Sequence, residues 1–174
     1  TGIDLVAQED SIIVTRTRDG EVATLSKSIG YNALPGDELS FSLPAQNRGV
    51  LPSPSTEMEI VVPDGDSSRQ AVPSIEAYSE QRIVIDWIVP EDSTIGNQTL
   101  TFTVDPDELI TGDANRSNNQ ATVDVFIGRA PNASIAIDTG NYTFEDVFID
   151  ARSSFDPDGG CLLYTSDAAD DVRG

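Results

Sequence analysis

The chain has 174 residues, which is enough for one ordinary domain and part of a second. Thirty acidic against ten basic residues give a formal net charge of −20 at pH 7, so a polyanion such as nucleic acid or an anionic membrane surface would be repelled. The absence of histidine and the single cysteine, Cys161, exclude a Ser-His-Asp triad, a Cys-His pair, a His/Cys zinc site and an internal disulfide. No apolar run approaches the roughly 20 residues of a membrane-spanning helix. Because no signal peptide precedes the first strand and Thr1 is not a natural start, we interpret the chain as an internal fragment.

A turn signal lies between two β-forming runs near the start of the chain. Asp19-Gly20 separates residues 13–14 from residues 22–25. A type I′ turn needs positive φ at both central residues, and an Asp-Gly pair is one of the sequences that adopt it most readily. The pattern therefore predicts a β-hairpin around this pair.

Several later segments alternate apolar and polar side chains, as half-buried strands do. They cover residues 38–45, 56–62 and 82–89, with a weaker candidate at 69–72. Pro44 has no N–H to donate, which predicts that the first of these strands lies at a sheet edge or carries a bulge. Trp87, the only tryptophan, is interpreted as a core residue whose indole N–H donates to a carbonyl.

The segment from Gly96 to Gly128 contains two more alternating runs on either side of a polar loop. Leu100, Phe102 and Val104 alternate with threonines, and the same period of two recurs in residues 121–127. These runs predict two strands of one antiparallel hairpin. Since no segment shows sustained helical periodicity, the predicted fold class is all-β, an immunoglobulin-like antiparallel β-sandwich of about seven strands within residues 3–128.

The loop of this hairpin is rich in oxygen ligands. Asp105, Asp107, Asp113 and Asn115 could converge at one end of the hairpin, and they form a candidate calcium site. Asp156 and Asp158 are a similar candidate near the end of the chain. The alternative is that these side chains cap backbone amides in turns and belong to a solvated acidic coat. No cofactor other than calcium is expected.

Two further patterns concern modification and catalysis. Asn-x-Ser/Thr sequons make glycosylation candidates of residues in predicted loops or strand ends, namely Asn97, Asn115, Asn132 and Asn141. The acidic pairs at 105/107 and 156/158 lie in Asp-Pro-Asp turns, with nothing to indicate a cleft between two carboxyls. Since no nucleophile–base arrangement is available either, the chain is not expected to be an enzyme.

Short motifs in a fixed order then indicate a family. They are Asp4-Leu5-Val6, Gly36-Asp37 before a strand that ends in Asn47-x-Gly49, Asp86-Trp87 with Pro90 and Gly96, Val104-Asp105-Pro106, and Asn118-Asn119. This series resembles the CARDB module, the cell-adhesion-related domain found in bacteria. The resemblance implies an immunoglobulin-like sandwich that occurs in tandem in large secreted or surface-anchored proteins of bacteria and archaea. The family commonly has a glutamate shortly before its Asn-Asn pair, and here any such acidic role would pass to Asp113.

A second resemblance begins after Gly128. Two expected strands, at 134–137 and 147–150, precede Ser153-Ser154-Phe155-Asp156-Pro157-Asp158-Gly159. This pattern is similar to the start of a PKD domain. The strand that follows in the PKD family is absent from this sequence. Residues 161–174 resemble the translation of a sequencing adapter. The expected organisation is therefore a CARDB-like sandwich at 1–128, a truncated PKD-like part at 129–160 and an artefact tail at 161–174.

Taken together, these expectations predict that the chain is a non-catalytic extracellular adhesion or spacer module of a large secreted or surface-anchored prokaryotic protein. Its expected partners are neighbouring domains of the same chain and a cell-surface protein or polysaccharide, with no nucleic acid and no membrane insertion. One alternative is an accessory substrate-binding domain of a secreted hydrolase, which a shared exposed face for Tyr31, Tyr78 and Phe126 would favour. Another is a calcium-rigidified linker, with ions near residues 128–131.

Overall fold

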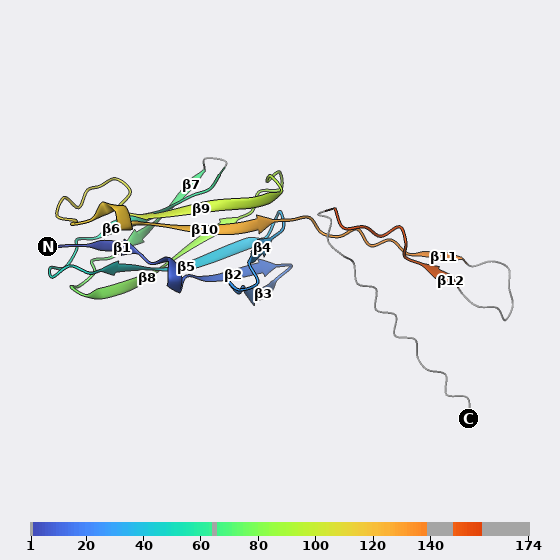
Figure 1. Cartoon of the computed structure of the whole chain (residues 1–174), viewed down its shortest axis with the longest axis horizontal. Helices are drawn as coiled ribbons and strands as arrows, with labels where there is room; N and C mark the ends of the chain where they lie inside the picture. The colour runs from blue at the N-terminus through green and yellow to red at the C-terminus, as the bar shows by residue number, and fades with distance from the viewer. Residues whose placement is uncertain (1, 64–65, 139–147, 158–174) are drawn as a thin grey trace, which may run out of the picture. The chain divides into compact units, whose positions relative to one another are not determined.

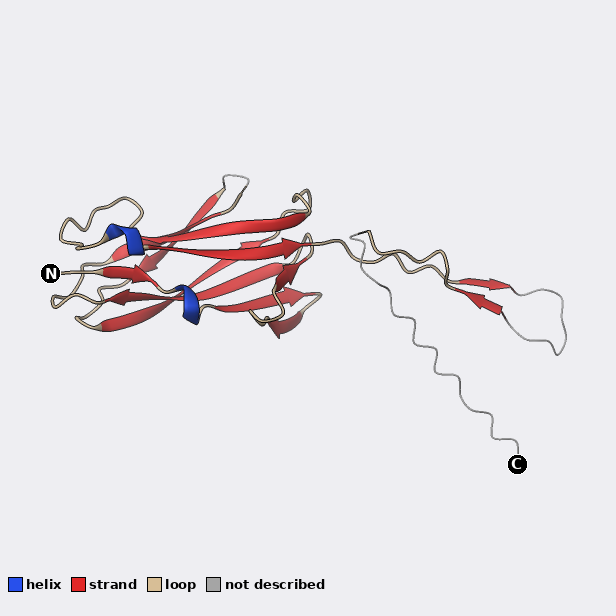
Figure 2. Ribbon diagram, in the orientation of Figure 1, coloured by secondary structure: helices blue, strands red, loops and turns tan. Residues whose placement is uncertain are grey.

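The computed structural model describes residues 2–63, 66–138 and 148–157, and these residues form strands, loops and two short 3₁₀ helices (Figures 1 and 2). The chain divides into two compact units, Thr1–Gly128 and Arg129–Gly174. In the described part of the chain, no helix has the length and apolar character that crossing a membrane requires.

The first unit is a sandwich of two five-stranded sheets, which confirms the predicted all-β fold. It has ten strands where about seven were expected, because several are too short to give an alternating pattern in the sequence. The strands are β1 (Leu5–Ala7), β2 (Ile13–Arg18), β3 (Glu21–Thr24), β4 (Tyr31–Ala33), β5 (Glu38–Asn47), β6 (Thr56–Val61), β7 (Ser67–Val72), β8 (Ser79–Ile88), β9 (Gly96–Val104) and β10 (Gln120–Ile127). The 3₁₀ helices are η1 (Glu9–Ser11) and η2 (Arg116–Asn118).

The first sheet is built around β5, which corrects the expectation of an edge or bulged strand. β8 pairs along the whole of one side of β5. On the other side, β2 pairs with residues 38–42 of β5 and β1 pairs with residues 45–47. The Pro44 carbonyl accepts a hydrogen bond from the Gln8 N–H at 3.1 Å. Since N–H and C=O of one strand residue point to the same side, the N–H that Pro44 lacks would face the gap between β1 and β2. A proline is therefore tolerated in a central strand.

The second sheet has the order β4-β10-β9-β6-β7. β9 and β10 pair as an antiparallel hairpin, as predicted. Gly96 lies opposite Ile127 at one end of the hairpin, and Thr103 lies opposite Gln120 at the other. The short strand β4 pairs with β10 in parallel, so the sandwich is antiparallel with one exception. The first hairpin is also confirmed, since Asp19 and Gly20 have φ values of 51° and 82° between β2 and β3.

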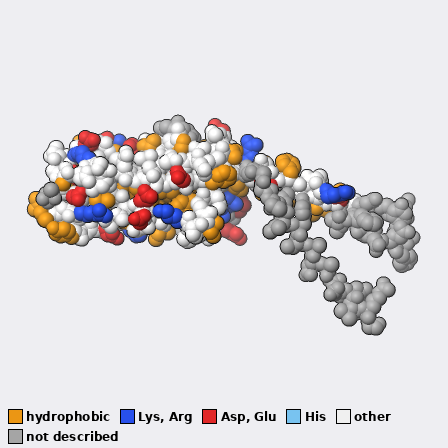
Figure 3. Space-filling model, viewed as in Figure 1, with side chains coloured by type: hydrophobic (Ala, Val, Ile, Leu, Met, Phe, Trp, Pro, Cys, Tyr) orange, Lys and Arg blue, Asp and Glu red, His pale blue; other side chains and the backbone are white. Residues whose placement is uncertain are grey.

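The core lies between the two sheets and follows the alternation seen in the sequence. The inward side chains of β5, β9 and β10 are buried, and Phe41 and Phe102 pack across the sandwich with ring centroids 5.2 Å apart. Trp87 packs against this core but is only partly buried, so it flanks the core and is not the fully buried residue that was expected. Charged side chains are dispersed over the face in Figure 3, as a solvated coat requires.

The second unit contains two described strands, β11 (Ala136–Asp138) and β12 (Phe148–Asp150). They pair in antiparallel fashion, close to the two strands expected from the sequence. A bridge between Asn132 and Phe155 extends the pairing. The PKD resemblance stays a prediction, and residues 161–174 lie outside the described residues.

Candidate functional site

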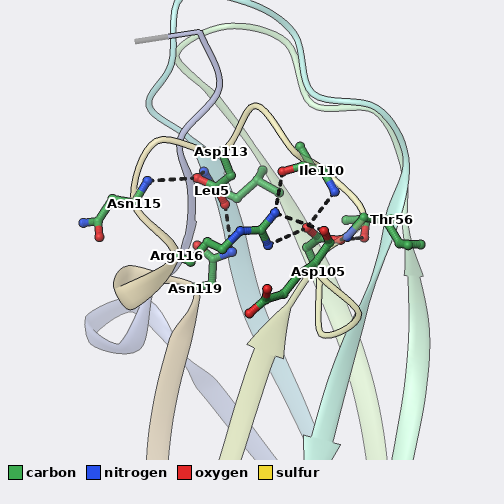
Figure 4. Close-up of polar contacts among 10 residues, drawn as sticks. Leu5, Thr56, Asp105, Ile110, Asp113, Asn115, Arg116 and Asn119 are labelled. Carbon is green, nitrogen blue, oxygen red and sulfur yellow. Dashed lines mark hydrogen bonds and ion pairs between the residues drawn. The ribbon is translucent and has the colours of Figure 1, made fainter.

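The acidic loop between β9 and β10 covers residues 105–119 and lies at the end of the sandwich where β1 begins (Figure 4). Its backbone returns sharply on itself, since Asp105 and Glu108 both have positive φ, 54° in each case. Such conformations are uncommon outside glycine, so the side-chain contacts of the loop must stabilise them.

Asp105 is the centre of this loop. Only 2% of the residue is exposed, although it carries a carboxylate. Its Oδ1 accepts hydrogen bonds from Thr56 Oγ1 at 3.0 Å and from the Leu109 N–H at 3.1 Å. Its Oδ2 accepts from the Ile110 N–H at 3.0 Å and from Arg116 Nη1 at 3.2 Å. These four donors replace the water that the carboxylate loses on burial.

Arg116 completes the arrangement from the η2 side of the loop. Besides its ion pair with Asp105, its Nη2 donates to the carbonyl oxygens of Ile110 at 2.7 Å and Glu108 at 3.1 Å. One guanidinium therefore neutralises the buried carboxylate and holds the backbone that wraps around it. We refer to this arrangement as the Asp105–Arg116 clamp.

Asp113 ties the same loop to β1. Its Oδ1 accepts from the N–H groups of Leu5 and Asn115, each at 3.3 Å, and its Oδ2 accepts from Asn119 Nδ2 at 2.8 Å. The adjacent Ala114 N–H donates to the carbonyl oxygen of Ile3 at 2.9 Å. The first strand is thus fastened to a loop more than a hundred residues later in the chain.

Asp107 points away from this network. It is exposed and pairs with Arg69 on β7 at 2.6 Å, and the same guanidinium contacts Glu57 and Glu59 at 3.1 Å each. Hydrogen bonds donated by Arg69 lower the pKa of Asp107, and its hydrogen bonds to Asp107, Glu59 and Glu57 raise the pKa of Arg69. This group attaches the edge strand β7 to β6 and to the loop.

The four candidate calcium ligands therefore have separate partners. Asp105 and Asp107 face two different arginines, and Asp113 faces backbone N–H groups and the Asn119 side-chain amide. Asn115 uses its Oδ1 to accept from the N–H and hydroxyl of Ser117, at 3.3 and 2.6 Å. Among the described residues no group of three or more acidic side chains is arranged to hold a metal ion. This geometry supports the alternative of turn stabilisation, and calcium stays a prediction.

The remaining candidate residues are dispersed. Asp156 is partly buried in the second unit, and Asp158 lies outside the described residues. Asn97 on β9, Asn115 in the loop and Asn132 in the second unit are exposed, and Asn141 lies outside the described residues. Glycosylation at all four stays a prediction.

The expected aromatic residues do not form one platform. Phe126 projects from the outer face of the second sheet. Tyr31 on β4 lines a hollow of about 270 Å³ between η1 and β10, whereas Tyr78 lines a separate hollow of about 540 Å³ beside the end of β5. Because the three rings lie in different places, the shared exposed face that would favour an accessory substrate-binding domain is not formed by these residues.

Sequence reasoning missed a second clamp at the opposite end of the sandwich. Asp37, 2% exposed, accepts from Arg18 Nε and Nη2 at 2.7 and 2.6 Å and from the Leu34 N–H at 2.7 Å. Burial alone raises the pKa of Asp37, but these hydrogen bonds and the Arg18 charge more than offset it, so its pKa lies below the usual value. The available signal was an aspartate in a Pro-Gly-Asp turn directly before a strong strand.

The family comparison agrees with this architecture. The CARDB family model matches residues 19–123, which is more than half of the chain. The chain belongs to the CARDB family. CARDB is a non-catalytic domain family, and the match ends within β10 of the first unit.

Two solved structures, one of them a CARDB domain, have the same fold. The crystal structure of the CARDB domain of a Pyrococcus furiosus protein, in complex with di-metal ions, is 18% identical over 73% of this chain and 90% of that one, with a TM-score of 0.52. A solution structure of a Methanosarcina acetivorans domain, from a protein given the provisional name of cell surface protein, is 24% identical over 73% and 93%, with a TM-score of 0.51. At these identities the likeness establishes the fold alone. The comparison with curated proteins gave no match.

Proposed function

We propose that the first unit is a non-catalytic extracellular module that spaces, or presents for adhesion, the domains of a large secreted or surface-anchored prokaryotic protein. The observation that carries this proposal is the placement of its two ends. Leu5 pairs with Asn47 at one end of the sandwich, and Ile127 pairs with Gly96 at the other (Figure 1). A chain that enters and leaves at opposite ends adds length with every module.

The added length follows from the strands. β9 has nine residues, and a strand rises about 3.3 Å per residue, so the sandwich spans roughly 30 Å between its ends. A compact module with both ends on one side would add far less reach per residue. This favours a spacing role.

The two clamps support the same role. Asp105–Arg116 fixes the loop beside β1, and Asp37–Arg18 fixes the turn beside the start of β5. Loops at both ends are therefore held by charge-assisted hydrogen bonds, which are stronger than neutral ones. The provisional cell-surface name of the Methanosarcina relative supports an extracellular location for this chain as well.

Two alternatives have less support. An accessory substrate-binding role would gain from grouped aromatic side chains, and Tyr31, Tyr78 and Phe126 are dispersed. A calcium-rigidified linker would fit the di-metal ions of the Pyrococcus relative, but the loop carboxylates here are hydrogen-bonded to protein donors.

Single-molecule force spectroscopy tests the proposal. The full chain is placed between reference domains and pulled from its two ends. Residues 2–128 extend to about 3.5 Å each when unfolded, so we expect one force peak followed by roughly 400 Å of added length. The same chain coated on beads tests adhesion, through retention on surfaces that carry prokaryotic polysaccharide. Unfolding without a resolved force peak, together with no retention on any such surface, would refute the proposal.

A further inference from the structure

Two exposed side chains of different chemistry meet on the outer face of the second sheet. Asn97 begins the sequon Asn97-Gln98-Thr99 and is exposed on β9. Phe126 on β10 is 41% exposed and is its direct partner in the strand register. Inward residues of both strands alternate with these two, so both side chains project to the solvent side.

The register brings the two groups within contact range. Directly opposed residues of antiparallel strands have Cβ atoms about 4.5–5.5 Å apart. The neighbouring outward pair, Thr99 and Asp124, is joined by a hydrogen bond of 2.6 Å, which shows that cross-strand pairs on this face are in contact. Phe126 therefore offers an exposed aromatic ring beside the Asn97 amide.

The Asn97 side chain itself is exposed to solvent. It projects from the outer face of the sheet, so a large substituent on it displaces no buried side chain. A phenylalanine exposed on the outer face also gains from being covered by a partly apolar group.

We propose that Asn97 is an N-glycosylation site and that the first sugar of its glycan packs on the Phe126 ring. The proposal rests on the extracellular location proposed above. The donor is a lipid-linked oligosaccharide phosphate. A bond forms between Asn97 Nδ2 and C1 of the sugar, the bond from C1 to the phosphate oxygen breaks, the lipid phosphate leaves, and the amide nitrogen gives up one proton to the transferase.

The order of the strands permits this transfer. An acceptor sequon must be extended and accessible, and β9 is synthesised before its partner β10. Once β10 pairs, the carbohydrate lies on the outer face and disturbs no buried side chain. Its C–H groups then cover the ring, as apolar groups cover aromatic faces elsewhere.

The experiment uses the full chain secreted from cultured insect cells behind an added leader peptide. Because secretion is imposed, the result does not depend on the native location, and failure here is distinct from failure of the spacer proposal. Peptide mass mapping measures occupancy at each sequon. Thermal unfolding is then measured for the wild type, Asn97→Gln, Phe126→Thr and the double variant, after trimming each glycan to its first sugar.

We expect Asn97 to be occupied and its sugar to raise the unfolding midpoint by roughly 2–5 °C when residue 126 is phenylalanine. With Phe126→Thr the sugar should have no such effect, and Phe126→Tyr should restore it. Asn115→Gln is the matched control, since removal of that exposed loop sequon should give the same midpoint change whatever residue 126 is. An unmodified Asn97, or a sugar effect independent of residue 126, would overturn the proposal.

Discussion

Replacing Asp105 with asparagine tests whether the Asp105–Arg116 clamp stabilises the sandwich. Asparagine keeps the size of the side chain and tolerates positive φ as aspartate does, so the backbone at 54° is not newly strained. The change removes the charge and turns one acceptor oxygen into a donor. In either orientation of the amide, that donor faces a backbone N–H, of Leu109 or of Ile110, which is a donor itself.

The magnitude follows from burial. The Asp105 side chain is 1% exposed and that of Arg116 is 30% exposed, so solvent screens their interaction weakly. Removing one partner of a buried ion pair costs about 3–5 kcal/mol, a large part of the stability of an ordinary domain. With a urea m-value of roughly 2 kcal/mol per molar, the unfolding midpoint should fall by about 2 M.

Urea unfolding followed by the fluorescence of Trp87 measures this change, since the side chain is partly buried and is the only tryptophan. Asp107→Asn is the matched control, because that carboxylate lies in the same loop but is exposed, and its midpoint should hardly move. Arg116→Met combined with Asp105→Asn should cost less than the sum of the single changes, because neither group is then left unpaired. Equal midpoints for Asp105→Asn and Asp107→Asn would refute the reasoning.

Three other outcomes are expected. The pKa of Asp37 is lowered in the folded state, so its contribution to the unfolding free energy is complete above the unfolded pKa of about 3.9. That contribution is lost as the pH falls through the folded pKa. Below pH 4 the unfolding free energy should therefore fall more steeply with decreasing pH in the wild type than in Asp37→Asn. Gly49→Ala should destabilise more than Gly20→Ala in thermal unfolding, because its Cβ would lie 2.6 Å from Ile3 Cα, within the buried backbone. A Cβ on Gly20 meets no atom and adds only the strain of its left-handed backbone at a φ of 82°, about 1–2 kcal/mol, so equal losses would contradict this reasoning. Calcium and a chelator should give the same thermal midpoint, since the Asp105 oxygens already accept four hydrogen bonds, and a rise with calcium would support a metal site after all.

Alternation in the sequence was sufficient to predict most of the fold. Leu39, Phe41 and Leu43 on β5, like the inward residues of β9 and β10, recur with a period of two, and a strand can bury only one such set on a given face. The Asp19-Gly20 turn was predictable for a local reason, its tolerance of positive φ. These features need no knowledge of which strands are neighbours.

The central position of β5 depends on neighbours that the local pattern does not identify. Pro44 suggested an edge because a proline removes one ladder hydrogen bond. In the folded sheet that position coincides with the gap between β1 and β2, where no donor is required. The parallel pairing of β4 with β10 was equally hidden, since a three-residue strand shows no period.

The sequence determined that the loop between β9 and β10 is acidic and that its aspartates suit turns or cations. Only the tertiary structure decided which partner each aspartate has, because Arg69 reaches Asp107 from another strand and Arg116 folds back onto Asp105. It also paired Asp37 with Arg18 and set Phe126 beside Asn97. The physical reason is that alternation and turn chemistry act between near neighbours in the chain, whereas charge pairing and burial act between groups that only folding brings together.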